Sequence, residues 1–262
     1  MKYKLYQVDA FTDALFGGNP AAVCPLPGWL NDGLLQKIAM ENNLAETAFY
    51  VRRNGRYEIR WFTPKVEVDL CGHATLAAAF VLFHCEDYSG DTIDFYSPRS
   101  GLLNVRRNSE WLTLDFPVDV FHKIPVSSEI LSCFDKQPVE AYKGKTDYML
   151  VYEKESDIRD INPHFDAISL LKARGVIITA KGEDVDFVSR FFAPQSGIIE
   201  DPVTGSAHTT LAPYWVDKMK KAEMSAVQLS ERKGYLQCKC SGNRVEISGQ
   251  AKLYLTGEIY IG

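Results

Sequence analysis

Residues 69–83 join a small polar turn directly to a long apolar run, and this junction limits the folds open to the chain. The turn reads Asp-Leu-Cys-Gly-His, and no charged residue follows it before Glu86. A helix over this run is apolar on every face, which predicts a buried helix rather than an amphipathic surface helix. Its first backbone N–H groups lack intrahelical acceptors and, with the helix dipole, favour an anion at this end. We therefore expect the junction to be a site of chemistry.

The composition of the chain favours a small ligand. The 262 residues can bury a large core, either in one domain or in two of about 130 residues each. A net charge of -5 with scattered basic residues argues against a nucleic-acid partner. The uncharged stretch 70–85 is 16 residues long and contains two histidines, so it is too short and too polar to cross a bilayer. No membrane segment is expected.

The cysteine pattern indicates free thiols in the cytoplasm. The chain has six cysteines and no CxxC pair, and residues 1–8 alternate like a strand rather than a signal peptide. Cys71 and His73 are two residues apart, but no third ligand follows at a spacing typical of metal sites. We therefore expect no metal.

The second half of the chain repeats a pattern of the first. Residues 190–194 (Arg-Phe-Phe-Ala-Pro) resemble residues 60–64 (Arg-Trp-Phe-Thr-Pro), and residues 204–207 resemble residues 71–74. The sequence separation between equivalent residues grows from 130 for Pro64 and Pro194 to 133 for Gly72 and Gly205. The second copy therefore has three extra residues, near residues 200–202. A repeat of this length indicates a domain duplication rather than a solenoid. We expect two domains, residues 1–118 and 119–262. The C-terminal residues of the chain can cross over to the first domain.

Each predicted domain combines strands with one buried helix that begins at a glycine-centred turn. Pro213 lies inside the second such helix, over residues 207–219, which predicts a bend or a shorter helix. Two helix N-termini that face each other across an interdomain cleft suit a carboxylate. The expected substrate is therefore a small organic acid.

Polar residues near these turns are the candidates for chemistry in the cleft. A carboxyl group with a pKa raised by desolvation can take a proton from carbon and return it. Each candidate also has a structural explanation, such as a solvated surface carboxylate, a turn former before proline or a buried thiol. The candidates are Glu46, His73, Asp201 and Ser206, with Asn19 on the rim and Cys71 as a further possibility.

Four segments in order along the chain resemble the PhzF-like (phenazine-biosynthesis-like) proteins of the diaminopimelate epimerase-like superfamily. They are residues 17–23 (GGNPAAV), 43–49 (NLAETAF), 69–75 (DLCGHAT) and 200–208 (EDPVTGSAH). The resemblance implies an α+β fold of two pseudo-symmetric domains, each a curled, mostly antiparallel, barrel-like sheet around a central helix. It also implies an active site between the domains and a homodimer.

The resemblance further implies a cofactor-independent isomerase. The namesake of the family moves a proton within dihydro-hydroxyanthranilate during phenazine biosynthesis. By this resemblance Glu46 is the acid/base, and the site is completed by catalytic His73 and Asp201 and by substrate-binding Asn19, Gly72, Gly205 and Ser206.

Two other functions stay open. The epimerases of the superfamily use one cysteine from each half, and here Cys71 matches the first while Thr204 occupies the second position. A threonine hydroxyl cannot serve as a base near neutral pH as a thiolate can. A cysteine-assisted epimerase or racemase using Cys71 is therefore the second hypothesis, and a non-catalytic metabolite-binding protein is the third.

Overall fold

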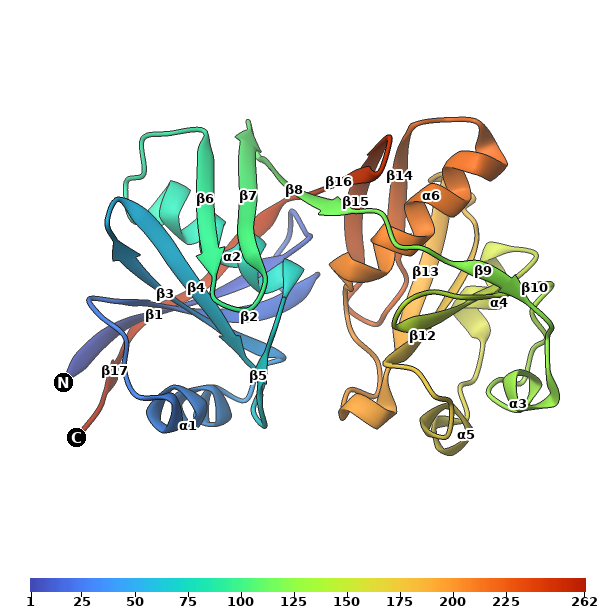
Figure 1. The fold of residues 1–262 in the computed structure, drawn as a ribbon, viewed down its shortest axis with the longest axis horizontal. Coiled ribbons are helices and arrows are strands. Elements are labelled where there is room, and N and C mark those ends of the chain that lie inside the picture. The colour runs from blue at the N-terminus through green and yellow to red at the C-terminus, as the bar shows by residue number, and fades with distance from the viewer. The chain divides into compact units, whose positions relative to one another are not determined.

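The computed structural model describes residues 1–262, and the chain divides into two compact units. Unit 1 comprises residues 1–115 together with residues 248–262, and unit 2 comprises residues 116–247. Unit 2 is thus inserted in the sequence between the two parts of unit 1. Each unit contains a curled sheet with helices, as Figure 1 shows.

Unit 1 is built on one curled sheet in which two pairs of neighbouring strands are parallel and the others are antiparallel. The order β17, β1 and β2 is antiparallel, β2 and β3 are parallel, β3 and β4 are antiparallel, β4 and β6 are parallel, and β6, β7 and β8 are antiparallel. Helix α1 connects the first parallel pair and α2 the second. The strands are β1 (Lys2–Ala10), β2 (Asn19–Leu26), β3 (Glu46–Arg53), β4 (Arg56–Phe62), β5 (Glu67–Val68), β6 (Thr92–Ser97), β7 (Gly101–Asn108), β8 (Trp111–Pro117) and β17 (Ala251–Tyr260).

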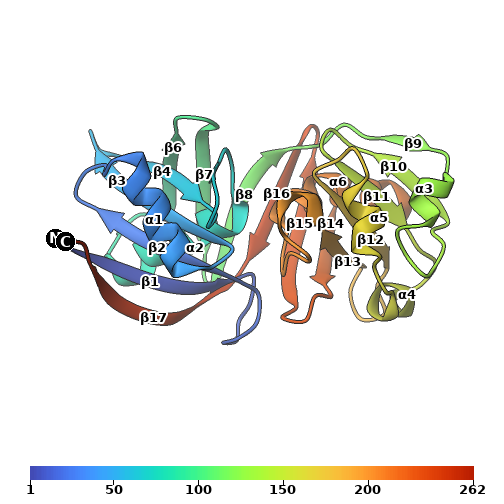
Figure 2. The same ribbon diagram turned by 90° about the horizontal axis from the view of Figure 1, so that it is seen from below.

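Helix α2 (Gly72–Cys85) is buried over most of its surface, as expected from its apolar run. Its residues 73–79 and 81–83 are buried, and it packs against β1, β2 and β3. Helix α1 (Asp32–Asn42) lies on β3 and β4 (Figure 2), and the Asn31 side chain caps it by accepting the Leu34 N–H at 2.9 Å. None of the helices combines the length and the apolar composition that crossing a membrane requires.

Unit 2 repeats the order of strand pairings found in unit 1. Strands β9, β10 and β11 are antiparallel, β11 and β12 parallel, β12 and β13 antiparallel, β13 and β14 parallel, and β14 and β15 antiparallel. This shared topology confirms the duplication. The strands are β9 (His122–Ile124), β10 (Glu140–Lys143), β11 (Asp147–Val151), β12 (Gly175–Lys181), β13 (Phe187–Phe192), β14 (Glu223–Gln228), β15 (Gly234–Ser241) and β16 (Arg244–Gly249), the last of which ends in unit 1.

The helices of unit 2 occupy positions equivalent to α1 and α2. Two short helices lie between the parallel strands β11 and β12, and one long helix lies between β13 and β14. The indole of Trp215 on the long helix donates to the Thr179 hydroxyl of β12 at 3.0 Å. The helices are α3 (Ser128–Leu131), α4 (Glu155–Asp160), α5 (Phe165–Ser169) and α6 (His208–Met219), with 3-10 turns η1 (Pro194–Ser196) and η2 (Gly205–Ala207).

Helix α6 continues through Pro213. The proline removes the N–H that would bond to the Thr209 carbonyl, and the backbone N–H of Asp119 bonds to that carbonyl instead, at 3.1 Å. The sequence predicts either a bend or a shorter helix. Helix α6 has 12 residues and α2 has 14, so the shorter helix is observed. The difference arises at its start, where the 3-10 turn η2 precedes it, and not at the proline.

Gly18 makes the turn between β1 and β2 possible. Its φ of +59° is in the left-handed region, and a Cβ there would lie 2.1 Å from the Ala10 carbonyl oxygen. Only glycine fits this position. The turn sets Asn19 as the first residue of β2, opposite Ala10.

The carboxylate of Glu140 should make unit 2 sensitive to acid. It accepts hydrogen bonds from the Tyr142 hydroxyl at 2.6 Å and from Lys218 Nζ at 3.1 Å. The Tyr142 hydrogen bond and, against the effect of burial, Lys218 lower the pKa of Glu140 to about 2. Because the folded pKa lies below the ordinary value of 4.5, this carboxylate stabilises the fold above that value, and its contribution is lost as the pH falls through about 2.

We therefore expect Glu140→Gln to destabilise the protein by about 1 kcal/mol at pH 7, a fall of roughly 2–4 °C in Tm. Thermal unfolding between pH 7 and pH 2 should show the gap from wild type shrinking as the pH falls. The control Glu223→Gln removes an exposed pair with Lys239 and should leave Tm unchanged at pH 7. A gap that stays constant down to pH 2 would show that the charge of Glu140 is not the cause.

Candidate functional site

Three segments of unit 1 bring the predicted site residues of this unit together. Strands β2 and β3 are parallel neighbours, and Asn19 and Glu46 are their first residues, so both side chains come from the same edge of the sheet. Cys71 is the N-cap of α2, and Gly72 and His73 begin the helix. The site is thus formed by regular elements rather than by a long loop.

The imidazole of His73 is the centre of this cluster. Its Nε2 lies 3.2 Å from Glu46 Oε2, and its Nδ1 lies 3.3 Å from Asn19 Nδ2 and 3.5 Å from Cys71 Sγ. The four residues expose between 0% (Asn19) and 9% (Glu46) of their surface. The expectation that Asn19 lies on the rim is therefore wrong, because it is fully buried beside His73.

His73 is held so that Nε2–H donates to the Glu46 carboxylate. Burial lowers the pKa of His73, but the adjacent Cys71 and Glu46 outweigh burial and raise it well above the ordinary value of 6.5. The Asn19 amide can serve Nδ1 in either protonation state, since its nitrogen donates and its oxygen accepts. Burial, together with the charge of Glu46, raises the pKa of the Cys71 thiol.

Besides Cys71 and His73, the cluster contains a third residue that can bind a metal ion, Glu46, which the spacing of residues in the sequence did not indicate. One donor atom from each of Glu46, Cys71 and His73 lies within 4.8 Å of the other two. The expectation that no third ligand accompanies Cys71 and His73 is therefore wrong. Glu46 is distant from Cys71 and His73 in sequence. It comes close to them because β3 pairs with β2 and helix α2 packs against both strands.

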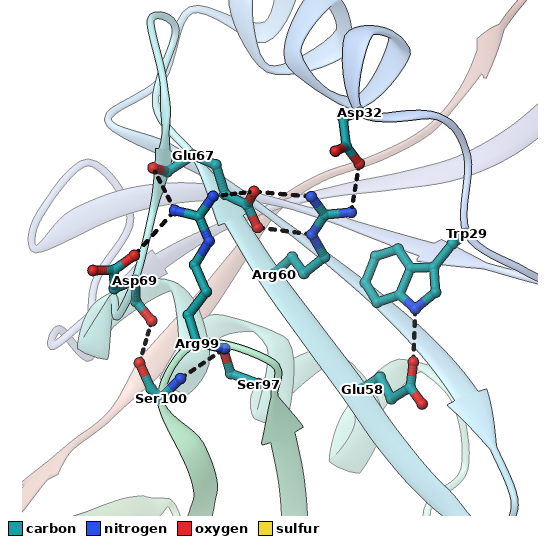
Figure 3. Close-up of polar contacts among 9 residues, drawn as sticks. All are labelled: Trp29, Asp32, Glu58, Arg60, Glu67, Asp69, Ser97, Arg99 and Ser100. Carbon is teal, nitrogen blue, oxygen red and sulfur yellow. Dashed lines mark hydrogen bonds and ion pairs between the residues drawn. The ribbon is translucent and has the colours of Figure 1, made fainter.

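A network of charged side chains fixes the segment that leads into α2 (Figure 3). Glu67 accepts two hydrogen bonds from Arg60, at 2.7 and 2.8 Å, and one from Arg99, at 2.9 Å. Arg99 also bonds to Asp69 at 3.0 Å, and Arg60 to Asp32 at 2.9 Å. Bidentate pairs of this kind fix direction as well as distance. The network therefore orients the two residues, 69 and 70, that precede Cys71.

Unit 2 contains the equivalent ion pair. Arg190 donates to Glu200 at 2.7 and 2.9 Å, and its guanidinium lies 4.9 Å from the Phe192 ring, as Arg60 lies 5.1 Å from the Phe62 ring. Since Glu200 thus corresponds to Glu67, the offset of 133 already applies there. The three extra residues lie within 194–199, in the η1 turn and the segment after it, and not at residues 200–202 as expected from the sequence.

The loop that begins with Asp201 is held by a buried glutamine that sequence reasoning missed. Gln228, at the end of β14, is fully buried; its Nε2 donates to the Asp201 carbonyl at 2.6 Å, and its Oε1 accepts the Thr204 N–H at 2.8 Å. The Thr204 hydroxyl donates to the Asp201 carboxylate at 2.6 Å. No motif contains Gln228, so only the strand pairing reveals its role.

The remaining predicted residues lie at the start of the second central helix. Gly205 and Ser206 form the turn η2, with Gly205 buried and Ser206 partly exposed. His208 is fully buried and contacts the Thr204 carbonyl through Nδ1 at 3.0 Å, and burial lowers its pKa to about 4. His208 is therefore a neutral structural residue. Asp201, Thr204, Gly205 and Ser206 form one short segment in unit 2, as Cys71, Gly72 and His73 do in unit 1.

Comparisons with known proteins identify the fold and the family. The solved structure of a PhzF-family phenazine biosynthesis protein from Enterococcus faecalis has a TM-score of 0.97 and 47% identity, with 100% of both chains covered. A predicted epimerase from Pseudomonas aeruginosa shares the fold, with a TM-score of 0.77 at 21% identity over 99% of this chain and 100% of its own. The fold is thus of the diaminopimelate epimerase-like class.

The sequence relatives agree with the structures. The family model for phenazine biosynthesis-like proteins, PhzC-PhzF, matches residues 8–257. An uncharacterized isomerase of Pseudomonas aeruginosa is 49% identical over 261 residues, covering 100% of both chains. The chain belongs to the PhzC-PhzF family, which confirms the resemblance seen in the four sequence segments.

We expect Gln228→Met to destabilise unit 2 by about 1–3 kcal/mol, because it leaves the buried Thr204 N–H and Asp201 carbonyl without their partner. Urea unfolding measures the change. The control Gln237→Met alters an exposed glutamine of β15 and should stay within about 0.5 kcal/mol of wild type. Equal stability of both variants would remove Gln228 from its proposed role.

Proposed function

We propose that this chain is a cofactor-independent isomerase that moves a proton between carbons of a small carboxylated substrate. Glu46 is the general acid/base in this proposal. The observation that carries it is the buried contact of 3.2 Å between the Glu46 carboxylate and His73 Nε2. The names of curated relatives, such as the uncharacterized isomerase of Pseudomonas aeruginosa, support the reaction class.

The geometry suits a carboxylate that takes a proton from carbon and returns it. One Glu46 oxygen accepts a hydrogen bond from His73, which fixes the side chain, and in this proposal the other oxygen takes the proton from the substrate. Positioned acid/base groups of this kind contribute roughly 10² to 10⁴ in rate. His73 then acts on the reaction by holding the Glu46 carboxylate and by balancing its charge.

Within unit 2 we propose that Asp201, Gly205 and Ser206 contact the substrate, and within unit 1 we propose the same for Asn19 and Gly72. Support comes from unit 2 itself, where Gln228 and Thr204 hold the Asp201 segment in one conformation. Within each unit, the N–H groups at the start of the central helix suit an anionic group. We further propose that the protein acts as a homodimer in the cytoplasm, and the six free cysteines fit a reducing compartment.

The expected consequence is that Glu46→Gln loses solvent proton exchange by at least about a hundredfold while it still binds the ligand. Small carboxylates are first screened for thermal stabilisation, and those that bind are followed by proton NMR in D₂O. The matched control Glu41→Gln changes an exposed glutamate of α1 and should exchange at the wild-type rate. Full exchange by Glu46→Gln would exclude Glu46 as the acid/base.

A cysteine-assisted epimerase is the alternative that a specific contact favours, because Cys71 Sγ lies 3.5 Å from His73 Nδ1. Against it, burial raises the pKa of this thiol, and the equivalent position in unit 2 is Thr204. We expect Cys71→Ser to keep most of the exchange activity in the same NMR assay. Loss of all exchange in a folded Cys71→Ser protein would favour the epimerase, and absence of exchange in the wild type with every bound carboxylate would favour a binding protein.

A further inference from the structure

We propose that Glu46, Cys71 and His73 form a binding site for one thiophilic divalent cation such as Zn²⁺, and that the bound cation inhibits the enzyme. The binding depends only on the three donor groups. The inhibition rests on the proposed function, because it requires Glu46 to be the acid/base.

The spacing of the donor atoms fits a tetrahedral ion. Zn²⁺ bonds of about 2.0–2.3 Å to nitrogen, oxygen and sulfur place the donors roughly 3.3–3.6 Å apart. Here His73 Nε2 lies 3.2 Å from Glu46 Oε2 and 4.0 Å from Cys71 Sγ, and all three donors lie within 4.8 Å of one another. Small side-chain rotations of Glu46 and Cys71 close the remaining difference.

The surroundings of the cluster resemble those of built metal sites. A ligating histidine donates its other ring N–H, so His73 Nδ1–H needs an acceptor. Asn19 Nδ2 lies 3.3 Å from His73 Nδ1, and a half-turn of the Asn19 amide group presents its oxygen as that acceptor. The side chains of Glu46 and His73 expose 11% and 6% of their surface, so the cluster is shielded but still open to a small ion. Three protein donors leave the fourth position of the ion for water or for a carboxylate.

The donor set selects the ion. A thiol among the ligands favours Zn²⁺ and Co²⁺ over Mg²⁺ and Ca²⁺, which prefer oxygen donors. Binding releases two protons to the solvent, the thiol proton of Cys71 and the Nε2 proton that His73 donates to Glu46 in the metal-free site, and it occupies a lone pair of the Glu46 carboxylate. That carboxylate then cannot accept a proton from a substrate carbon, so proton exchange stops while the ion is bound.

The binding test uses the full chain freed of metal. Zn²⁺ is titrated in competition with a chromophoric chelator, and Co²⁺ is titrated while the sulfur-to-metal charge-transfer absorption is recorded. We expect one ion per chain, a charge-transfer band with Co²⁺, and no competition by Mg²⁺. Cys71→Ser should lose the band and weaken Zn²⁺ binding by at least about a hundredfold.

Control variants separate this site from adventitious binding by other thiols. The double variant Cys85→Ser/Cys240→Ser removes the two partly exposed cysteines and should bind Zn²⁺ like the wild type. The nearly isosteric Glu46→Gln should weaken Zn²⁺ binding as well, which keeps the test valid if Cys71→Ser does not fold. Unchanged affinity in Cys71→Ser, or loss of binding in the double variant alone, would overturn the site.

Proton exchange in D₂O, measured with and without one equivalent of Zn²⁺, tests the inhibition. We expect at least a tenfold loss that a chelator reverses. Undiminished exchange with the ion bound would overturn the inhibition. Stoichiometric Zn²⁺ binding by a protein that exchanges no proton with any bound carboxylate would refute the proposed function and leave the metal site standing.

Discussion

Each unit depends on an arginine–glutamate pair that holds the segment between a strand and the central helix. Arg60 and Glu67 expose only 15% and 13% of their side chains, and Arg190 and Glu200 expose 14% and 22%. A largely buried charge that loses its partner is strongly destabilising, so these pairs restrict how the segments can run. Because the central helices start directly after them, the positions of all candidate site residues near the helix starts follow from these two contacts.

The second constraint is the parallel pairing of β2 with β3. Parallel strands begin at the same edge of a sheet, so the pairing sets Glu46 opposite Ala21, two residues after Asn19, although α1 separates the two strands in sequence. The start of α2 then brings His73 between Asn19 and Glu46. A site formed by two strand starts and one helix start keeps its geometry with little dependence on loops, which suits acid/base chemistry that needs fixed distances.

The sequence allowed the central helix, the duplication and the family to be predicted, because each leaves a local pattern: an apolar run, a repeated segment and four motifs. It placed Glu46, Cys71 and His73 on the right elements but gave neither their contact nor the burial of Asn19, which depend on strand pairing. Gln228 belongs to no motif and could not be found from local pattern. Glu67 and Glu200 were detectable in principle, since each follows a repeated arginine segment, but the three-residue insertion between Pro194 and Glu200 obscured their equivalence.

Strand β17 pairs with β1 from Lys2 opposite Tyr260 to Ala10 opposite Ala251, so one neighbour of β1 is formed by residues 251–260. During synthesis, β1 therefore has β2 as one neighbour but lacks the other until residues 251–260 have been made. Unit 2 is continuous in sequence and has all of its strands earlier. During synthesis the N-terminal domain usually folds first, but here the strands of unit 2 are complete before those of unit 1.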